Sequence, residues 1–163
     1  MFVLTVKTKL KSKKRFLIFV CALFAVLTLI AFCAVSAVAK PADKAFCDSV
    51  GEYSLKAHSD EAVTQFVLQF SLELDELCRQ QRVYIPNTFD DTYTQYNNLQ
   101  KRQGLDLERY KGRECTLYIY KLKNYKIDYE DTYITIIVYK GTVVGGHIST
   151  AEMDSPMYTF FGE

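Results

Sequence analysis

The apolar residues of the chain are concentrated in one stretch near its beginning. Residues 16–39 contain no charged residue, no glycine and no proline, whereas apolar and polar residues mix in shorter patterns from residue 40 onward. As a helix these 24 residues would measure about 36 Å, which exceeds the roughly 30 Å of a bilayer's hydrocarbon core. The pattern therefore predicts a transmembrane helix over 16–39, followed by a folded region.

Beyond this stretch, apolar residues first recur at helical spacing between Val63 and Phe70. Ser59 can cap a helix there, and the two acidic residues that follow it suit the positive end of the helix dipole. We therefore expect a first helix over 60–71. Shorter alternations at Leu72 and Leu74, and again at Val83 and Ile85, predict short strands on either side of 76–81.

A second helix is predicted by agreement between caps, charge and periodicity. Asn87 or Thr88 can cap it, acidic residues fill its first turn, basic residues fill its last turn, and Gly104 can end it. The apolar positions of this helix lie three or four residues apart, at Phe89, Tyr93, Tyr96 and Leu99.

The period changes to two in the last third of the chain. Residues 116–120, 132–139 and 142–149 are rich in β-branched and aromatic residues, with a tight turn at Lys140-Gly141 and a bulge at Gly145-Gly146. These three strands predict an antiparallel meander. The expected fold class is α+β: an N-terminal transmembrane helix, then two helices packed on one face of an antiparallel β-meander.

The charges divide the chain where the hydrophobicity does. Residues 1–15 carry six basic and no acidic residues, which leaves 14 basic against 19 acidic residues in 40–163, a formal charge of −5. Basic residues beside a membrane span stay in the cytoplasm. We therefore expect a basic cytoplasmic tail (1–15), a transmembrane helix acting as signal anchor (16–39), a linker (40–57) and an extracytoplasmic α+β domain (58–163).

Two alternatives for this N-terminal region remain open. Ala37-Val38-Ala39 satisfies the small-x-small rule of signal peptidase, so the segment can also be a long signal peptide whose removal would release a secreted protein. Both readings place 40–163 outside the cytoplasm. The anchored reading predicts a single-pass protein of the cell membrane with its C-terminal domain extracellular. The acidic domain argues against nucleic-acid binding, which needs a basic surface.

Three cysteines follow the apolar stretch, so at most one pair can close among them. Cys78 and Cys115 flank expected structured elements, whereas Cys47 lies in the expected linker, and we therefore predict a disulfide between Cys78 and Cys115. Three free thiols are the alternative. No CxxC spacing or neighbouring histidine supports a zinc site or a redox motif.

No motif identifies a catalytic, metal-binding or cofactor-binding residue. Neither His58 nor His147 has a nucleophile beside it in the sequence, and the acidic groups at 90–91 and 128–131 lack the ligand spacing of a calcium loop. Four tyrosines on adjacent expected strands could form a ligand-facing aromatic surface or fill the core: Tyr118, Tyr120, Tyr133 and Tyr139.

Several segments of the chain are similar in sequence to a known protein family. Residues 83–86, Phe89, 93–112 (YTQYNNLQKRQGLDLERYKG) and 138–146 (VYKGTVVGG) together resemble the bacterial family known as domain of unknown function 4830. The resemblance covers roughly 60–160, with departures at Ser71-Leu72 and at His147. It implies a cell-envelope protein of Firmicutes, often membrane-anchored, and it implies no activity, cofactor or site residue.

These observations favour a non-enzymatic module that binds an envelope protein, a peptide or a wall component near the membrane. One alternative is a small hydrolase acting on wall or peptide substrates, which requires two of His58, His147 and the acidic residues to meet in one pocket. A second alternative is a secreted inhibitor-like domain, which requires cleavage after Ala39.

Overall fold

The computed structural model describes residues 41–127, 130–152 and 155–162. No helix among these residues is long and apolar enough to cross a membrane. The predicted tail (1–15) and transmembrane helix (16–39) lie outside the described residues, so both stay predictions.

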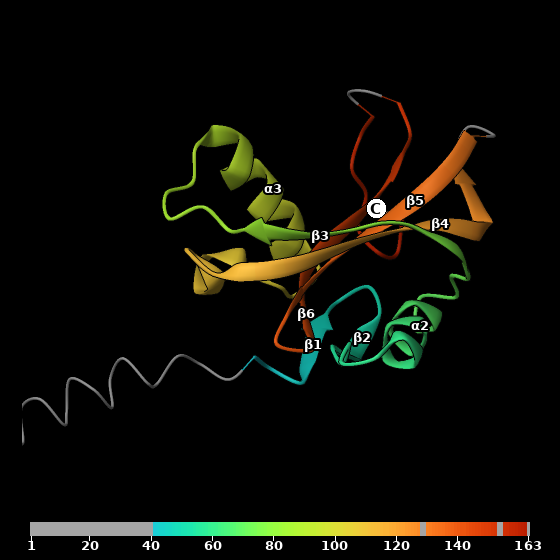
Figure 1. Ribbon diagram of the computed structural model, residues 1–163, viewed down its shortest axis with the longest axis horizontal. Helices are drawn as coiled ribbons and strands as arrows, with labels where there is room; N and C mark the ends of the chain where they lie inside the picture. The colour runs from blue at the N-terminus through green and yellow to red at the C-terminus, as the bar shows by residue number, and fades with distance from the viewer. Residues whose placement is uncertain (1–40, 128–129, 153–154, 163) are drawn as a thin grey trace, which may run out of the picture. The chain divides into compact units, whose positions relative to one another are not determined.

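A four-stranded antiparallel sheet forms the centre of the described region (Figure 1). Its strands follow one another in chain order: β3 (Leu74–Tyr84), β4 (Glu114–Ile127), β5 (Glu130–Tyr139) and β6 (Thr142–Thr150). The predicted meander is confirmed as β4-β5-β6, and so is the α+β class. Lys140 and Gly141 form the expected tight turn with positive φ angles of 49° and 78°. The bulge falls at Val144, one residue before its predicted place.

The sheet has one strand that the sequence pattern divided in two. β3 runs without a break through 76–81, where two separate short strands were expected. Nearly all of its side chains are exposed, because β3 is an edge strand with little packed on either face. An edge strand with little packed on either side needs no apolar alternation, so its polar middle gave no strand signal.

The two helices pack on opposite faces of the sheet, which corrects the expectation that both cover one face (Figure 1). α2 (Asp60–Leu68) contributes Val63, Phe66 and Val67 to one buried cluster, together with Ile134 and Ile136 of β5. α3 (Asp91–Arg102) and the 3-10 helix η1 (Leu107–Tyr110) pack on the other face. The reason is that β5 is apolar on both faces, so each face needs a cover.

Residues 44–54 are not the linker that the sequence predicted. They form a hairpin of β1 (Lys44–Cys47) and β2 (Gly51–Ser54), with Ala45, Cys47 and Tyr53 buried in the cluster beneath α2. The Tyr53 hydroxyl donates a hydrogen bond to the carbonyl of Gln103, just beyond α3. Strands of four residues are too short for their alternation to stand out from the surrounding Ala, Asp and Ser.

Local hydrogen bonds set the limits of both helices. Ser59 caps α2 as predicted, accepting a bond from the Ala62 backbone N–H, but α2 ends at Leu68 and not at 71, since Ser71 adopts a positive φ of 58°. α3 is capped by Asp90, whose carboxylate accepts from the Tyr93 N–H at 2.7 Å, and not by Asn87 or Thr88. All three are good capping residues, so the sequence alone did not select between them.

Candidate functional site

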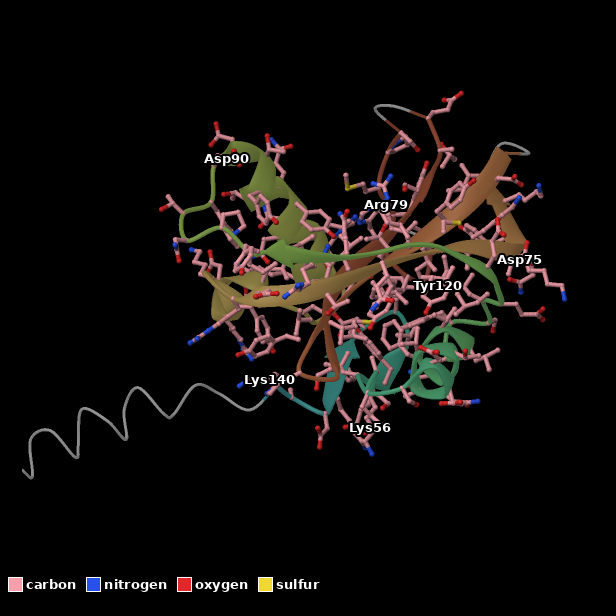
Figure 2. The ribbon with its side chains drawn as sticks, viewed as in Figure 1. Lys56, Asp75, Arg79, Asp90, Tyr120 and Lys140 are labelled. Atoms are coloured by element: carbon pink, nitrogen blue, oxygen red, sulfur yellow. The ribbon has the colours of Figure 1, made fainter. Side chains whose placement is uncertain are left out.

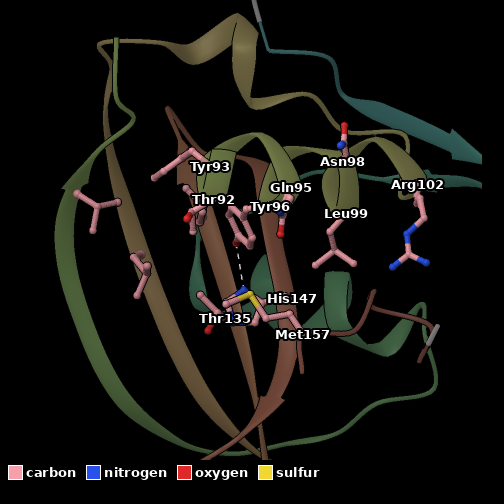
Figure 3. Close-up of a pocket in the computed structure, with 13 residues that line it drawn as sticks. Thr92, Tyr93, Gln95, Tyr96, Asn98, Leu99, Arg102, Thr135, His147 and Met157 are labelled. Carbon is pink, nitrogen blue, oxygen red and sulfur yellow. Dashed lines mark hydrogen bonds between the residues drawn. The ribbon is translucent and has the colours of Figure 1, made fainter. Parts of the chain in front are cut away.

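A cavity of about 790 Å³ lies between α3 and the sheet (Figure 3). We call it the α3 cavity. Its helix wall carries Tyr93, Tyr96 and Leu99, which share one side of α3 because they lie three residues apart. Its floor is the sheet face formed by Val83 of β3, Leu117 of β4, Ile137 of β5 and His147 of β6, and Met157 also lines the cavity. The walls are therefore largely apolar and aromatic.

One polar pair joins the helix wall to the floor. The Tyr96 hydroxyl and Nδ1 of His147 are 3.0 Å apart, and their rings meet nearly at right angles (Figure 3). Burial lowers the pKa of His147 to about 4, and burial also raises the pKa of Tyr96. Both side chains are therefore neutral at physiological pH, and the pair offers hydrogen bonding without charge.

The lining carries little charge. Within the described residues, Arg102 at the end of α3 is the one charged side chain of the lining, which includes no aspartate or glutamate. His58, the other histidine considered from the sequence, is exposed and lies beside the β5–β6 turn near Gly141. Among the described residues, neither His58 nor an acidic side chain lines the cavity beside His147.

Two buried glutamines hold the elements around the cavity together. Gln100 and Gln103 are both fully buried. Gln103 donates from Nε2 to the Gly146 carbonyl (3.0 Å) and accepts at Oε1 from the Phe160 N–H (2.7 Å), which ties the segment carrying Met157 to α3 and β6. Gln100 accepts at Oε1 from the Gly146 N–H (2.8 Å), while its Nε2 has no partner within the described residues.

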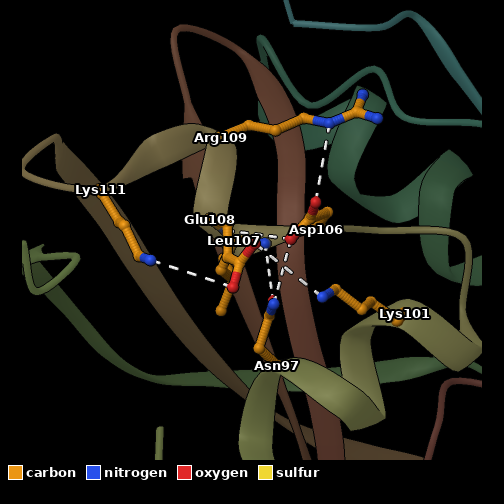
Figure 4. A network of polar contacts seen from close by, with 7 residues as sticks. All are labelled: Asn97, Lys101, Asp106, Leu107, Glu108, Arg109 and Lys111. Carbon is orange, nitrogen blue, oxygen red and sulfur yellow. Dashed lines mark hydrogen bonds and ion pairs between the residues drawn. The ribbon is translucent and has the colours of Figure 1, made fainter. Parts of the chain in front are cut away.

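A second polar network fixes the chain just after α3 (Figure 4). Asn97 is buried on the helix; its Oδ1 accepts from the Leu107 N–H at 2.8 Å and its Nδ2 donates to Asp106 at 3.0 Å. Asp106 in turn caps η1 by accepting from the Glu108 N–H. The surrounding ion pairs of Glu108 with Lys101 and Lys111 are long and exposed. The hydrogen bonds of the Asn97 side chain therefore fix the conformation of this segment more than the ion pairs do.

Sequence reasoning missed both networks. A helix that is polar on its surface shows no signal for which glutamine or asparagine is buried. The one indication in the sequence that these glutamines are buried is their position. Gln100 and Gln103 are three residues apart, next to the apolar positions Tyr96 and Leu99. That spacing places them on the edge of the buried side of α3.

The four tyrosines expected to form one aromatic surface do not share a face. Tyr118 and Tyr120 lie opposite Ile136 and Ile134, which belong to the buried cluster beneath α2. The rings of the two tyrosines stack with their centroids 6.3 Å apart. Tyr133 and Tyr139 alternate with those isoleucines and belong to the other face. Tyr120 and Tyr139 are buried, and none of the four lines the α3 cavity. The alternative prediction, that these tyrosines fill the core, fits the two buried rings of Tyr120 and Tyr139.

The predicted disulfide between Cys78 and Cys115 is wrong. Both are free thiols, Cys78 exposed and Cys115 buried, and Cys47 is free as well. Cys115 lies opposite Val83, five residues along β3 from Cys78, which is roughly 16 Å at the usual rise of a strand. A disulfide needs Cα atoms within about 7 Å. The long, uninterrupted β3 therefore separates the two thiols.

The acidic groups have structural partners. Asp90 caps α3, and Asp131 forms ion pairs with Lys121 (2.6 Å) and Lys126 (2.9 Å). Hydrogen bonds from these two lysines lower the pKa of Asp131 to about 2. Asp128 and the side chain of Glu130 lie outside the described residues. Within those residues, no group of three or more metal-ligating side chains comes together.

Comparison with known proteins gives one match. The family model described as "Domain of unknown function (DUF4830)" matches residues 66–148, just over half of the chain. The match includes β3, α3, η1, β4 and β5 and nearly all of β6, and so it includes the floor and the helix wall of the α3 cavity. The chain matches no curated protein and no solved structure.

Proposed function

The chain belongs to the DUF4830 family, whose description assigns no activity, and we propose that it is a non-enzymatic binding module whose binding site is the α3 cavity. The observation that carries the proposal is the cavity itself. It has the size of a small-ligand or side-chain pocket, with apolar walls and a few polar groups, which is the usual composition of a binding site.

The chemistry of the lining favours binding over catalysis. In nucleophilic catalysis a histidine activates a neighbouring nucleophile and is oriented by a third group, whereas the partner of His147 is the hydroxyl of Tyr96, which burial keeps protonated. His147 is also neutral at physiological pH. Nothing in the described lining favours the hydrolase alternative, and the neutral pair suits an uncharged or apolar group of a protein, peptide or wall component.

The place of action is proposed from the sequence. The uncharged stretch 16–39 and the six basic residues before it support a single-pass anchor with a cytoplasmic N-terminus and an extracytoplasmic binding domain. Membrane fractionation with intact-mass analysis tests this proposal: we expect the full-length mass in the membrane fraction. A mass that begins at Lys40, found in the medium, would contradict the anchor and would support the secreted inhibitor-like reading.

The binding site is tested by photo-crosslinking in living cells. A photoreactive phenylalanine analogue replaces Asn98, an exposed residue of the cavity rim, in the full-length chain. A second version carries it at Asp48, an exposed residue that does not line the cavity. We expect a discrete adduct from position 98 alone, found as an added mass on the intact chain.

Two further substitutions make the result specific to the cavity. Leu117→Trp adds bulk to the cavity floor and should abolish the adduct. Ile119→Trp is the matched control, because Ile119 is equally half-buried on the same face of β4, two residues further on, but does not line the cavity. Adducts of equal yield from positions 98 and 48, or adducts that survive Leu117→Trp, would contradict the proposed site.

A further inference from the structure

The two edges of the sheet differ in whether other segments of the chain pair with them. The outer edge of β6 is covered at both ends: Lys56 bridges to Thr142, and Tyr158 exchanges two backbone hydrogen bonds with Ile148. Along β3, by contrast, no described segment pairs with the outer edge. An uncovered edge of this kind can accept a further strand from another chain.

Only the second half of β3 has a regular edge. The pairing with β4 shifts register twice between Leu74 and Arg79 and is then continuous from Arg79 to Tyr84. Bulges of this kind disturb the edge of the first half and disfavour strand pairing there. The regular half is also the part of β3 that borders the α3 cavity, because Val83 belongs to its lining.

The direction of the backbone groups along this half follows from the alternation of an antiparallel ladder. Ile85 bonds toward β4 through both its N–H and its carbonyl, to Arg113 and Gly112. Since hydrogen-bonded and non-bonded pairs alternate, the N–H and C=O groups of Tyr84, Arg82 and Gln80 point away from β4, toward the free edge. Three donors and three acceptors are therefore available to an added strand.

The side chains of β3 determine which residues suit the cavity-facing side of an added strand. Val83, Gln81 and Arg79 lie on the cavity face, since Gln81 is opposite Leu117 of the cavity floor. Arg79, on the α3 side of β3, has no ion pair among the described residues (Figure 2). A strand added here thus has the apolar Val83 of the cavity lining beside it near one end, and the unpaired positive charge of Arg79 beside it at the other.

We propose that the Arg79–Tyr84 edge of β3 binds an extended peptide segment of another protein, antiparallel to β3, with apolar side chains opposite Val83 and Gln81 and an acidic side chain opposite Arg79. This inference rests on the proposed binding function of the α3 cavity and names its ligand class: the apolar side chains of the peptide lie at the cavity mouth, while its backbone extends the sheet.

A second copy of this chain fits the edge less well than an acidic peptide. Two antiparallel Arg79–Tyr84 segments would place four arginines along one ladder, and the only acidic residue near them on the neighbouring strand is Glu114, which already binds Arg82 at 3.2 Å. Like charges brought together across a ladder destabilise it. Charge complementarity therefore selects a partner that carries a carboxylate.

The test uses defined peptides and the full-length chain in lipid nanodiscs. The probe is a fluorescein-labelled peptide, Thr-Leu-Thr-Leu-Thr-Glu, whose leucines fall opposite Val83 and Gln81 and whose glutamate falls opposite Arg79. Fluorescence anisotropy measures its binding. N-methylation of the third and fifth residues removes two N–H groups that would bond to β3, whereas N-methylation of the two leucines alters N–H groups that point away from it.

We expect methylation of the threonines to weaken binding about tenfold or more, and methylation of the leucines to weaken it less than about twofold. Arg79→Glu, at an exposed position, should weaken binding of this peptide and strengthen binding of the same peptide ending in lysine. Absence of binding, equal effects of the two methylations, or indifference to Arg79→Glu would each overturn the inference. The proposed function fails separately, if the cavity rim gives no specific crosslink.

Discussion

Protonation of His147 should destabilise the folded chain at mildly acidic pH. Burial lowers its pKa to about 4, compared with about 6.5 in an unfolded chain. The unfolded state therefore binds a proton that the folded state does not, so the stability present above pH 6.5 is lost as the pH falls toward 4. The hydrogen bond with Tyr96 can persist with His147 as donor, so the cost arises from burying the charge.

The magnitude follows from the two pKa values. Between pH 7 and pH 5 the free energy of unfolding should fall by about 2 kcal/mol, and by about 3 kcal/mol at pH 4, as an upper limit because the ring keeps some contact with solvent. Asp131, whose lowered pKa is about 2, loses its contribution only below pH 4 and so lies outside this window.

Urea unfolding at stepped pH, followed by circular dichroism, measures this dependence. His147→Asn keeps a polar group beside Tyr96 but does not titrate, so the wild-type and variant curves should converge as the pH falls from 7 to 4. His58→Gln removes the exposed histidine and should retain the full wild-type slope. Parallel curves for wild type and His147→Asn would refute the reasoning, since they would mean that the ring is not held neutral by burial.

Three further predictions concern the elements around the cavity. Gln103→Ala should lower the free energy of unfolding by about 2–4 kcal/mol in urea titrations, because it leaves the Gly146 carbonyl and the Phe160 N–H buried without partners; Gln65→Ala, at an exposed glutamine of α2 that does not line the cavity, should change it by less than about 0.5 kcal/mol. Gly146→Ala should yield no cooperatively folded chain by circular dichroism, since a Cβ there would lie 2.2 Å from a backbone carbonyl oxygen of β5 and 2.6 Å from the Phe160 ring. Maleimide should label Cys78 in the native chain and spare Cys115, whose burial raises its pKa to about 11, with peptide mass mapping as the readout; protection of Cys78 without reductant would contradict the free thiol.

The parts of the fold that the sequence predicted are those set by local pattern. Ser59 and the apolar positions after it predicted α2, and the β-branched runs predicted β4, β5 and β6, because caps and periodicity act within a few residues. The failures have a common physical cause. β3 is an exposed edge and the 44–54 hairpin has strands of four residues, so neither carries the alternation that a half-buried strand shows.

The candidate site depended on contacts that sequence spacing does not encode. Tyr96 and His147 are 51 residues apart, and their pairing requires α3 to lie over β6 on the face opposite α2. The sequence did place Tyr93, Tyr96 and Leu99 on one side of α3, but it gave no reason to separate a cavity wall from a packed core. The four tyrosines drew attention through their type, while their alternation along β4 and β5 put them on two faces.

The most direct test of the proposed binding site is native mass spectrometry of the full-length chain extracted from its own membranes in nanodiscs. We compare wild type with Leu117→Trp, which obstructs the α3 cavity, and with Ile119→Trp, which lies on the same face outside it. The account predicts one additional bound mass on wild type and on Ile119→Trp, and its loss from Leu117→Trp. A bound mass that persists in Leu117→Trp, or none on any of the three chains, would contradict the claim that this cavity is a binding site.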